Sequence, residues 1–377
     1  MHSRSPIGQA RGWATADDWV SLHIFHWGDQ NLLLTQAVAP LVRGLEESEL
    51  LRGWSFLRSW DGGPHVRLRL LPAKPVQTGA VRRAARRELT AHLSAHPAPM
   101  PVSASAYASS TATHARSRGL KWYDLSVSKP DTIEEVPYER EPSWYGHGES
   151  MTAAERHFSQ SSNLALPLLT GNTEPQVRMN VVLHHLTTAL AASGLSIPET
   201  ARLIDPQAIL ARARPTERRQ IASNAHATYR ARGASLCEQT FRLWALNGGA
   251  PAANVPEAAG PHRTLRAQGT GPAAAWSHSV RVLAARLTVL AGEGTYTPIT
   301  PAHLCPDSAW AGTRKPADKK ITVHHVLSHV THEFANRVGI SFQQETYLRL
   351  LLAHALHDLA PPRAKNRAAK RPHTTLR

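Results

Sequence analysis

Basic side chains alternate with apolar ones near residue 65, where the chain reads His65-Val-Arg67-Leu-Arg69. In a β-strand this spacing places the three basic side chains on one face. A run of turn residues, Asp61-Gly-Gly-Pro64, separates this segment from another alternating one, which predicts a β-hairpin. With these four residues as the loop, three pairs are expected to face each other: Trp60 and His65, Arg58 and Arg67, and Phe56 and Arg69.

Three guanidinium groups and one imidazole would then share one face of the hairpin. Like charges that lie opposite each other in a sheet are destabilising, so negative charge is expected above this face. Carboxylates from elsewhere in the chain would make it a salt-bridged surface, whereas an anionic or polar peptide would make it a binding floor. The sequence leaves both interpretations open.

A second group of reactive side chains lies on a predicted helix in the last quarter of the chain. His325, His329 and His332 are spaced i, i+4 and i+7, so one helix face carries three imidazoles, which could bind zinc. The pair His332-Glu333 does not begin an H-E-x-x-H metalloprotease motif, because Asn336 occupies the position of the second histidine. No nearby carboxylate ligand is evident in the sequence, so we expect no metal.

The chain of 377 residues is strongly basic, with 43 Lys and Arg against 28 Asp and Glu and a formal net charge of +15. Such an excess favours an acidic partner: nucleic acid, an anionic membrane or an acidic peptide. Part of the excess lies in residues 361–377, which contain six basic residues and no acidic one. We expect this tail to be disordered and residues 1–18 to be flexible.

Cysteine usage and hydropathy indicate the compartment. Cys237 and Cys305 lie far apart and outside any C-x-x-C pattern, so neither a disulfide framework nor a cysteine zinc site is expected. The N-terminal residues lack the apolar region of a signal peptide, and no segment approaches the roughly 18 apolar residues of a membrane span. We therefore expect a soluble, cytoplasmic protein.

The elements that position the basic residues belong to a predicted sheet. Trp19–Trp27 alternates, is rich in β-forming residues and is largely apolar on both faces, which predicts a central strand. Asp29 is expected to cap the helix that follows it. Residues 76–96 have the apolar stripe of an amphipathic helix, and the paired arginines within it are typical of a solvated surface.

Residues 97–171 give weaker signals. Thr152, three residues before Glu155, has capping-box spacing and predicts the start of a helix that ends near residue 171. Three further segments are expected here: a loop or edge strand at Pro97–Arg118, a short strand at Lys121–Val127 and a loop at Pro137–His147.

The rest of the chain has a helical period, interrupted by a Gly-, Ala- and Pro-rich stretch at 248–275 that we expect to be a mobile loop. Strands in the first third and helices afterwards predict an α+β fold around one sheet, with residues 19–360 as a single catalytic domain. The expected helices are Glu174–Ala192, Pro198–Ile204, Pro215–Arg232, Ser235–Leu246, Trp276–Leu290, Val323–Val338 and Phe342–Leu359.

Three sequence blocks share their order and spacing with a known family. The first is the opening strand with the basic hairpin; the second is Glu141-Pro-Ser-Trp-Tyr-Gly146 with its helix; the third is His332-Glu-Phe-Ala-Asn-Arg337, with Glu345 beyond. They resemble the thiopeptide-type bacteriocin biosynthesis domain, which also forms the glutamate-elimination half of lantibiotic dehydratases. Its motifs are E-x-x-R-Y-G-G and H-x-x-x-N-R. The resemblance implies its fold: a hairpin-containing sheet packed by helices, then a mostly helical C-terminal half.

The second block departs from the family at two positions. The elimination enzymes carry an arginine that helps to hold the glutamate ester and its leaving carboxylate, but this chain has Trp144 there, and His147 replaces the second glycine. An indole offers an aromatic platform in place of a bidentate cationic donor. The chain is therefore most similar to the stand-alone pyridine synthases of thiopeptide pathways. These perform a formal [4+2] aza-cycloaddition between two dehydroalanines of a modified peptide and then expel water and the leader peptide.

This resemblance implies an enzyme without a cofactor that acts mainly by positioning and desolvation. Candidates for proton transfer are His332, Tyr145 and His65. Candidates for holding the substrate or its leader are Arg58, Arg67, Arg69, Glu141, Trp144 and Asn336. Structural alternatives stay open: His332 could be hydrogen-bonded in the core, Tyr145 could serve only packing, and Glu141 could pair with Arg67.

The expected partner is a dehydrated, azole-containing precursor peptide with an acidic leader. A homodimer is left open, and no membrane is expected as a partner. A split dehydratase subunit that eliminates glutamate from glutamylated Ser or Thr is the first alternative function. The second is a non-enzymatic protein that binds nucleic acid or a leader peptide, but no zinc finger, helix-turn-helix spacing or aromatic-plus-basic RNA motif supports nucleic acid.

Overall fold

The computed structural model describes residues 14–98, 103–117, 126–170, 173–248, 271–296 and 319–360. The expectations for residues 1–13, 121–125, 249–270 and 361–377 lie outside these ranges. Within the expected flexible N-terminus, Ala16–Asp18 form a 3-10 helix. At the end of the expected mobile loop, residues 272–275 are helical, because helix α12 begins at Pro272.

Four antiparallel strands form one sheet: β1 (Val20–Phe25), β2 (Leu51–Ser59), β3 (His65–Pro72) and β4 (Thr132–Glu135). Their order is β2-β3-β1-β4, so β1 is paired on both sides and the prediction of a central strand is confirmed. The sequence did not predict β4, since four residues are too few to display a period.

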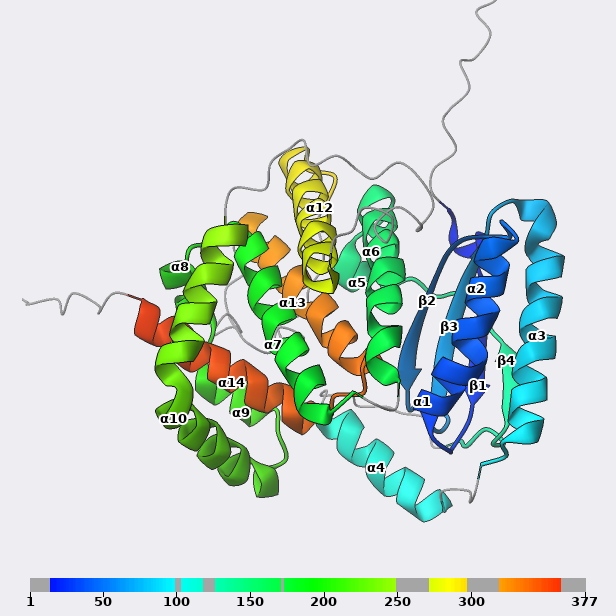
Figure 1. Cartoon of the computed structure of the whole chain (residues 1–377), viewed down its shortest axis with the longest axis horizontal. Helices are drawn as coiled ribbons and strands as arrows, with labels where there is room; N and C mark the ends of the chain where they lie inside the picture. The colour runs from blue at the N-terminus through cyan, green and yellow to red at the C-terminus, as the bar shows by residue number, and fades with distance from the viewer. Residues whose placement is uncertain are drawn as a thin grey trace, which may run out of the picture.

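One face of the sheet is apolar and is covered by helices (Figure 1). These are α1 (Gln30–Leu33), α2 (Ala39–Glu47) and α3 (Thr78–Ala95), and the predicted cap is confirmed because the Asp29 carboxylate accepts a hydrogen bond at the start of α1. A π-helical turn, Leu34–Val38, joins α1 to α2. Eight apolar sheet residues on this face are at most 1% exposed: Val20, Leu22, Ile24, Trp54, Phe56, Val66, Leu68 and Leu70.

The hairpin is confirmed, but its predicted register is wrong by one residue. Gly62 and Gly63 have φ angles of +76° and +114°, and the Gly63 N–H donates to the Trp60 carbonyl at 3.0 Å, so Trp60 belongs to the loop. The observed pairs are Ser59 and His65, Arg58 and Val66, Leu57 and Arg67, and Ser55 and Arg69. Because side chains alternate along a strand, Arg58 lies on the opposite face from the other two arginines.

The prediction of a loop or edge strand at 97–118 is also wrong, because Ala104–Ser117 form helix α4. This segment is rich in Ala and Ser and has no clear apolar stripe. An aromatic side chain attaches it to the hairpin. The buried Tyr107 hydroxyl accepts a hydrogen bond from the Gly62 N–H at 2.7 Å, and its ring stacks on Trp60 with centroids 6.2 Å apart.

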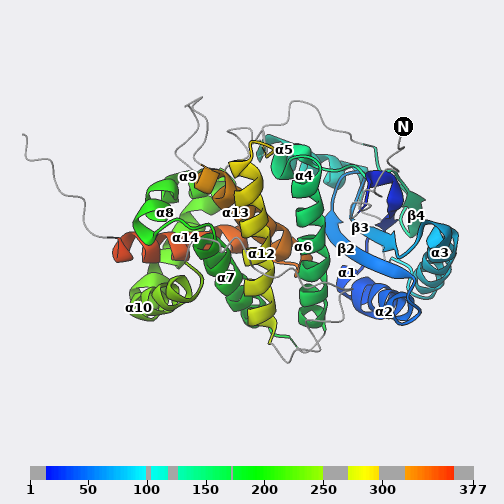
Figure 2. The ribbon, with the colours of Figure 1, turned by 90° about the horizontal axis from the view of Figure 1, so that it is seen from above.

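Beyond β4 the described residues are mostly helical, as predicted, and these helices extend away from the sheet (Figure 2). Helix α6 packs against β2, an outer strand of the sheet. The helices are α5 (Pro142–Tyr145), α6 (Glu149–Ala165), α7 (Pro175–Ala192), α8 (Ile197–Leu203), α9 (Pro206–Ala211), α10 (Pro215–Asn247), α12 (Pro272–Gly292), α13 (Lys319–Arg337) and α14 (Phe342–Leu359).

Four details of this helical half differ from the sequence predictions. Helix α10 is continuous where two helices were expected, α9 was not predicted, and Pro142–Tyr145 form α5 within the segment predicted to be a loop. Helix α6 begins at Glu149, so Thr152 is not its N-cap. No single helix within the described ranges is long and apolar enough to cross a membrane, although the bent pair α7 and α8 meets that criterion by length and composition alone.

Candidate functional site

The second face of the sheet carries the basic side chains of β3. Arg67 forms an ion pair with Asp61 at 2.9 Å, and its Nε donates to His65 Nε2 at 3.4 Å. His65 Nδ1 in turn donates to the Gly63 carbonyl at 2.9 Å, so both ring nitrogens have partners. Burial lowers the pKa of His65 to about 4 and that of the neighbouring His23 to about 3, so both rings are neutral at pH 7.

Arg69 lies deeper on the same face. It is 9% exposed, and its guanidinium lies 4.3 Å from the centre of the Tyr138 ring, a cation–π contact. The segment that carries Tyr138 is anchored by Arg140, which binds both oxygens of the buried Glu155 at 2.7 and 2.9 Å. Arg69 is therefore built into the fold, whereas Arg67 is half-buried and faces an exposed carboxylate.

Helix α5 is a single turn that presents Glu141, Trp144 and Tyr145 to this face and to α13. Gly146 follows its last residue with a φ angle of +71°, and a Cβ there would lie 2.7 Å from Ser150 Oγ and 2.8 Å from the Tyr296 ring. Only glycine fits this position without displacing its neighbours. The presence of glycine after Tyr145 in the motif thus has a steric explanation.

The two aromatic side chains of α5 contact His329 of α13. Trp144 stacks on the imidazole in parallel, with centroids 3.8 Å apart and planes 5° apart. Tyr145 lies 5.7 Å from the same ring and is 1% exposed, with Phe158 packed edge-on at 5.0 Å. Burial, together with the charges of the nearby carboxylates, raises the pKa of Tyr145 well above its ordinary value, so the phenol stays protonated.

Glu333 is the carboxylate at the centre of this cluster. It is 6% exposed, with His329 Nε2 at 3.9 Å from one oxygen and Arg337 Nη2 at 3.6 Å from the other. Burial raises the pKa of Glu333, and the positive charge of Arg337 opposes that shift. The charge of Glu333 also helps to raise the pKa of Tyr145, so a phenol, a carboxylate and an imidazole lie next to one another.

His332 points to a different partner. Its Nδ1 lies 2.6 Å from Glu345 Oε2, and Arg349 Nε binds the other oxygen of Glu345 at 2.8 Å. The side chain of His332 is 29% exposed, whereas those of Glu345 and Arg349 are 7% and 6% exposed. The buried ion pair of Glu345 and Arg349 thus holds the partly exposed imidazole of His332.

Asn336 and Arg337, the other members of the third block, fasten α13 to the sheet. The Asn336 amide accepts from the Arg58 N–H at 2.8 Å and donates to the Arg58 carbonyl at 3.0 Å, so it completes the hydrogen bonding of an outer strand. The Arg337 guanidinium is 1% exposed and donates to Ser162 and Ser161 of α6 at 3.2 and 3.3 Å. This motif therefore joins α6, α13 and β2.

Arg58 belongs to this anchor. Its Nε donates to the Arg337 carbonyl at 3.2 Å and its Nη2 to Asn31 at 2.7 Å. The expectation that Arg58 shares a face with the other hairpin arginines is wrong. Glu141 lies within electrostatic range of Arg67, but the ion pair of Arg67 is made with Asp61.

Glu141, His329 and Glu333 bring one potential ligand atom each within 4.8 Å of the others. This geometry could hold a metal ion, and it supplies the carboxylates that the sequence did not reveal. The surrounding charge opposes a cation, because Arg337 already neutralises Glu333 and Arg69 adds positive charge. The site balances its acidic groups with guanidiniums.

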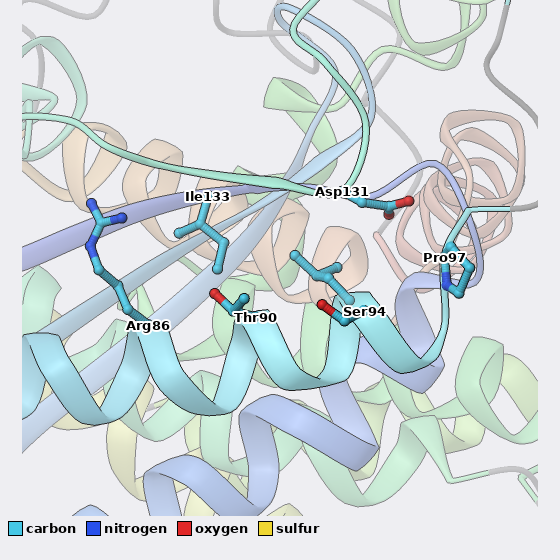
Figure 3. A pocket seen from close by; sticks show the side chains of 7 residues that line it. Arg86, Thr90, Ser94, Pro97, Asp131 and Ile133 are labelled. Carbon is cyan, nitrogen blue, oxygen red and sulfur yellow. The ribbon is translucent and has the colours of Figure 1, made fainter.

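A separate pocket lies between α3 and β4, with a volume of about 360 Å³ (Figure 3). Its one carboxylate, Asp131, is engaged by His26 at 2.8 Å and by the Ala98 N–H at 2.8 Å. None of the residues proposed from the sequence lines it. Its walls are Arg86, Thr90, Leu93, Ser94, Pro97, Asp131 and Ile133.

The candidate site is therefore the region between the basic face of the sheet, α5 and α13. Sequence reasoning selected Trp144, Tyr145 and His332 within it, but gave Glu333 no role and treated His329 only as a possible zinc ligand. Helical spacing could have linked His329 to Glu333, which are i and i+4 on α13. Their approach to α5 depends on tertiary packing.

The chain belongs to the lantibiotic biosynthesis dehydratase C-terminal family, whose profile matches residues 19–356. Among solved structures it is similar to TbtD, the pyridine synthase from thiomuracin biosynthesis, with a TM-score of 0.63 and 17% identity over 91% of this chain and 98% of that one. It is also similar to TsrL, with a TM-score of 0.59 and 18% identity over 90% and 94% of the two chains. At such identities the likeness establishes the fold alone. Among curated proteins, none matches this chain.

Proposed function

We propose that this protein is a pyridine synthase that closes a thiopeptide macrocycle. Two dehydroalanines of an azole-containing precursor would join in a formal [4+2] aza-cycloaddition, and loss of water and of the leader peptide would complete the pyridine ring. Family membership supports a peptide-modifying enzyme. The net charge of +15 suits a precursor with an acidic leader.

The observation that carries the proposal is the stack of Trp144 on His329, at 3.8 Å between centroids. The resemblance places an arginine at this position in the elimination enzymes. A neutral indole held flat against an imidazole cannot bind a leaving glutamate, but its half-buried surface suits azole rings. The substitution therefore favours cycloaddition over glutamate release.

The proposed roles follow from the environment of each side chain. The amide of one dehydroalanine must reach its iminol form, and the later eliminations need proton transfer, for which His332 is the exchanging group. Tyr145 keeps its proton, because burial raises the pKa of its phenol. Arg67, with Arg69 behind it, polarises an amide oxygen. His65 orients Arg67, while Asn336 and Arg58 hold the strand in place.

Glutamate elimination by a split dehydratase is the second candidate. Arg67 and Arg69 keep two guanidiniums on one face of the sheet, and these could bind a carboxylate. The two functions make opposite demands on position 144, so this position separates them.

The test compares Trp144→Phe with Trp144→Arg, each assayed by mass spectrometry for macrocyclisation of a bis-dehydroalanine azole peptide and for removal of glutamyl groups. Phenylalanine keeps an aromatic surface and should retain much of the cyclisation. Arginine should abolish cyclisation without creating glutamate elimination, since one contact cannot rebuild a pocket. Equal cyclisation by both variants would place Trp144 outside the site.

A further inference from the structure

We propose that Glu345 is the positioning residue for His332, holding its ring so that proton exchange with a substrate occurs through Nε2 alone. The catalytic consequence of this inference rests on the proposed function, but the structural part does not. Glu345 lies on α14, thirteen residues beyond His332 on α13, so it links two helices at the edge of the candidate site.

The contacts form a chain that leaves Glu345 little freedom. One oxygen accepts from His332 Nδ1 at 2.6 Å, and the other accepts from Arg349 Nε at 2.8 Å. Arg349 is itself fixed by Ser328 of α13, whose hydroxyl and carbonyl accept at 2.9 and 3.2 Å. Each member is therefore held by the next, and both ends of the chain lie on α13.

The charge state of Glu345 determines which nitrogen of His332 carries a proton. Burial alone raises the pKa of Glu345, but the charges of His332 and Arg349 and the hydrogen bonds from both hold it well below its ordinary value. An ionised carboxylate can only accept, so Nδ1 must donate whether the imidazole is neutral or charged. The one nitrogen left to gain or lose a proton is Nε2.

The distribution of burial supports a positioning role over a purely structural one. Glu345 and Arg349 are 7% and 6% exposed, whereas the His332 side chain is 29% exposed. A network that served only the core would have no reason to end on a partly open imidazole. A carboxylate that fixes the tautomer of a catalytic histidine acts in this way.

The direct test is long-range 15N NMR of His332 in the full-length protein, without substrate, in the wild type, Glu345→Gln and Arg349→Gln. The wild type and Arg349→Gln should show His332 protonated at Nδ1. Glu345→Gln should shift the neutral ring toward the Nε2-protonated form, because an amide can donate to Nδ1. An Nδ1-protonated ring that persists in Glu345→Gln would overturn the inference.

Kinetics on the bis-dehydroalanine peptide supply the second readout. Glu345→Gln should lower kcat by roughly 10²-fold or more with little change in KM, as for loss of a histidine-orienting carboxylate. In a His332→Ala background the same change should have almost no further effect. Losses that multiply would show that Glu345 acts independently of His332.

These two experiments separate the inference from the proposed function. If the protein cyclises no peptide but the tautomer depends on Glu345, the proposed function fails and the positioning role stands. Arg349→Gln also controls for stability, because both single variants leave one buried charge without its partner.

Discussion

At the scale of single residues, Arg67 and Arg69 lie two positions apart on β3 but have different surroundings. Arg67 faces Asp61, whose side chain is 75% exposed, so their ion pair contributes at most about 1 kcal/mol. Arg69 is buried beneath Tyr138 and interacts electrostatically with Glu333 and Arg337. Arg67 is thus partly exposed, whereas Arg69 is part of the core.

Arg67→Ala is expected to reduce kcat/KM by roughly 10²-fold through loss of a donor to the reacting amide. Its melting temperature should change by only a few degrees, because the lost ion pair is partly exposed. Asp61→Ala is the matched control, since it breaks the same ion pair but keeps the guanidinium. If both variants lost equal activity, the ion pair would matter and the guanidinium would not.

Glu141, His329 and Glu333 allow a prediction about metals. Because Arg337 and Arg69 supply the positive charge near Glu333, we expect turnover to be unchanged after dialysis against EDTA and after addition of Zn²⁺ at stoichiometric concentration. Metal analysis of the purified protein is the accompanying measurement. The prediction is contradicted if the protein holds one equivalent of tightly bound metal and loses its activity when that metal is removed. The negative charge of the carboxylates would then outweigh the positive charge of the guanidiniums.

At the scale of elements, the single turn of α5 must hold Trp144 and Tyr145 against α13. Gly146 allows the backbone to leave this turn with a positive φ angle. Gly146→Ala should unfold this turn locally and lower both activity and melting temperature, since the new Cβ would lie within 2.8 Å of Ser150 and Tyr296. Gly148→Ala is the control: its φ angle is +59°, but no atom lies within 4 Å of the added Cβ. Only the backbone strain of the positive φ angle remains there, on the order of 1–3 kcal/mol, without the clash that Gly146→Ala adds.

The hairpin shows how much of a structure a sequence pattern can predict. Alternation predicted both arms and the face carrying Arg67 and Arg69, but not the register, because the loop length depends on whether Trp60 joins the strand or the turn. Helix α4 was not predicted, because its sequence has no clear apolar stripe and its contact with the hairpin through Tyr107 depends on tertiary packing.

The candidate site, like the hairpin, could be predicted only in part. Motif likeness selected Trp144, Tyr145 and His332 and noted Glu345, but it assigned Asn336 and Arg58 to substrate binding. In the structure the Asn336 amide contacts the backbone of Arg58, and the Arg58 guanidinium contacts Arg337 of α13 and Asn31 of α1. A motif records that residues occur together, and only tertiary packing distinguishes those that hold the scaffold from those that face a substrate.

At the scale of the whole molecule, buried neutral histidines make the fold sensitive to acid. Burial lowers the pKa of His157 and of His324 to about 3, far below the ordinary value near 6.5. Below pH 6.5 the unfolded chain binds more protons than the folded one, so stability falls as pH falls, by up to about 1.4 kcal/mol per pH unit for each histidine.

The melting temperature should therefore drop between pH 7 and pH 5, before ordinary carboxylates titrate. His157→Gln removes one of the titrating groups, whose Nδ1 lies 2.8 Å from Ser279 Oγ, and should flatten the dependence even if it lowers stability overall. Thermal unfolding across this range is the measurement. A constant melting temperature from pH 7 to pH 5 would show that these rings bind protons in the folded state as readily as in the unfolded chain.

The central claim concerns the reaction, and a competition assay tests it most directly. The wild-type protein would be offered two peptides with the same leader and azole-bearing core, one with two dehydroalanines and the other with glutamylated serines at the same positions. Mass spectrometry should show only the first peptide consumed, giving a pyridine macrocycle and a released leader. Loss of glutamyl groups from the second peptide, with the first left unchanged, would contradict the account and identify an elimination enzyme.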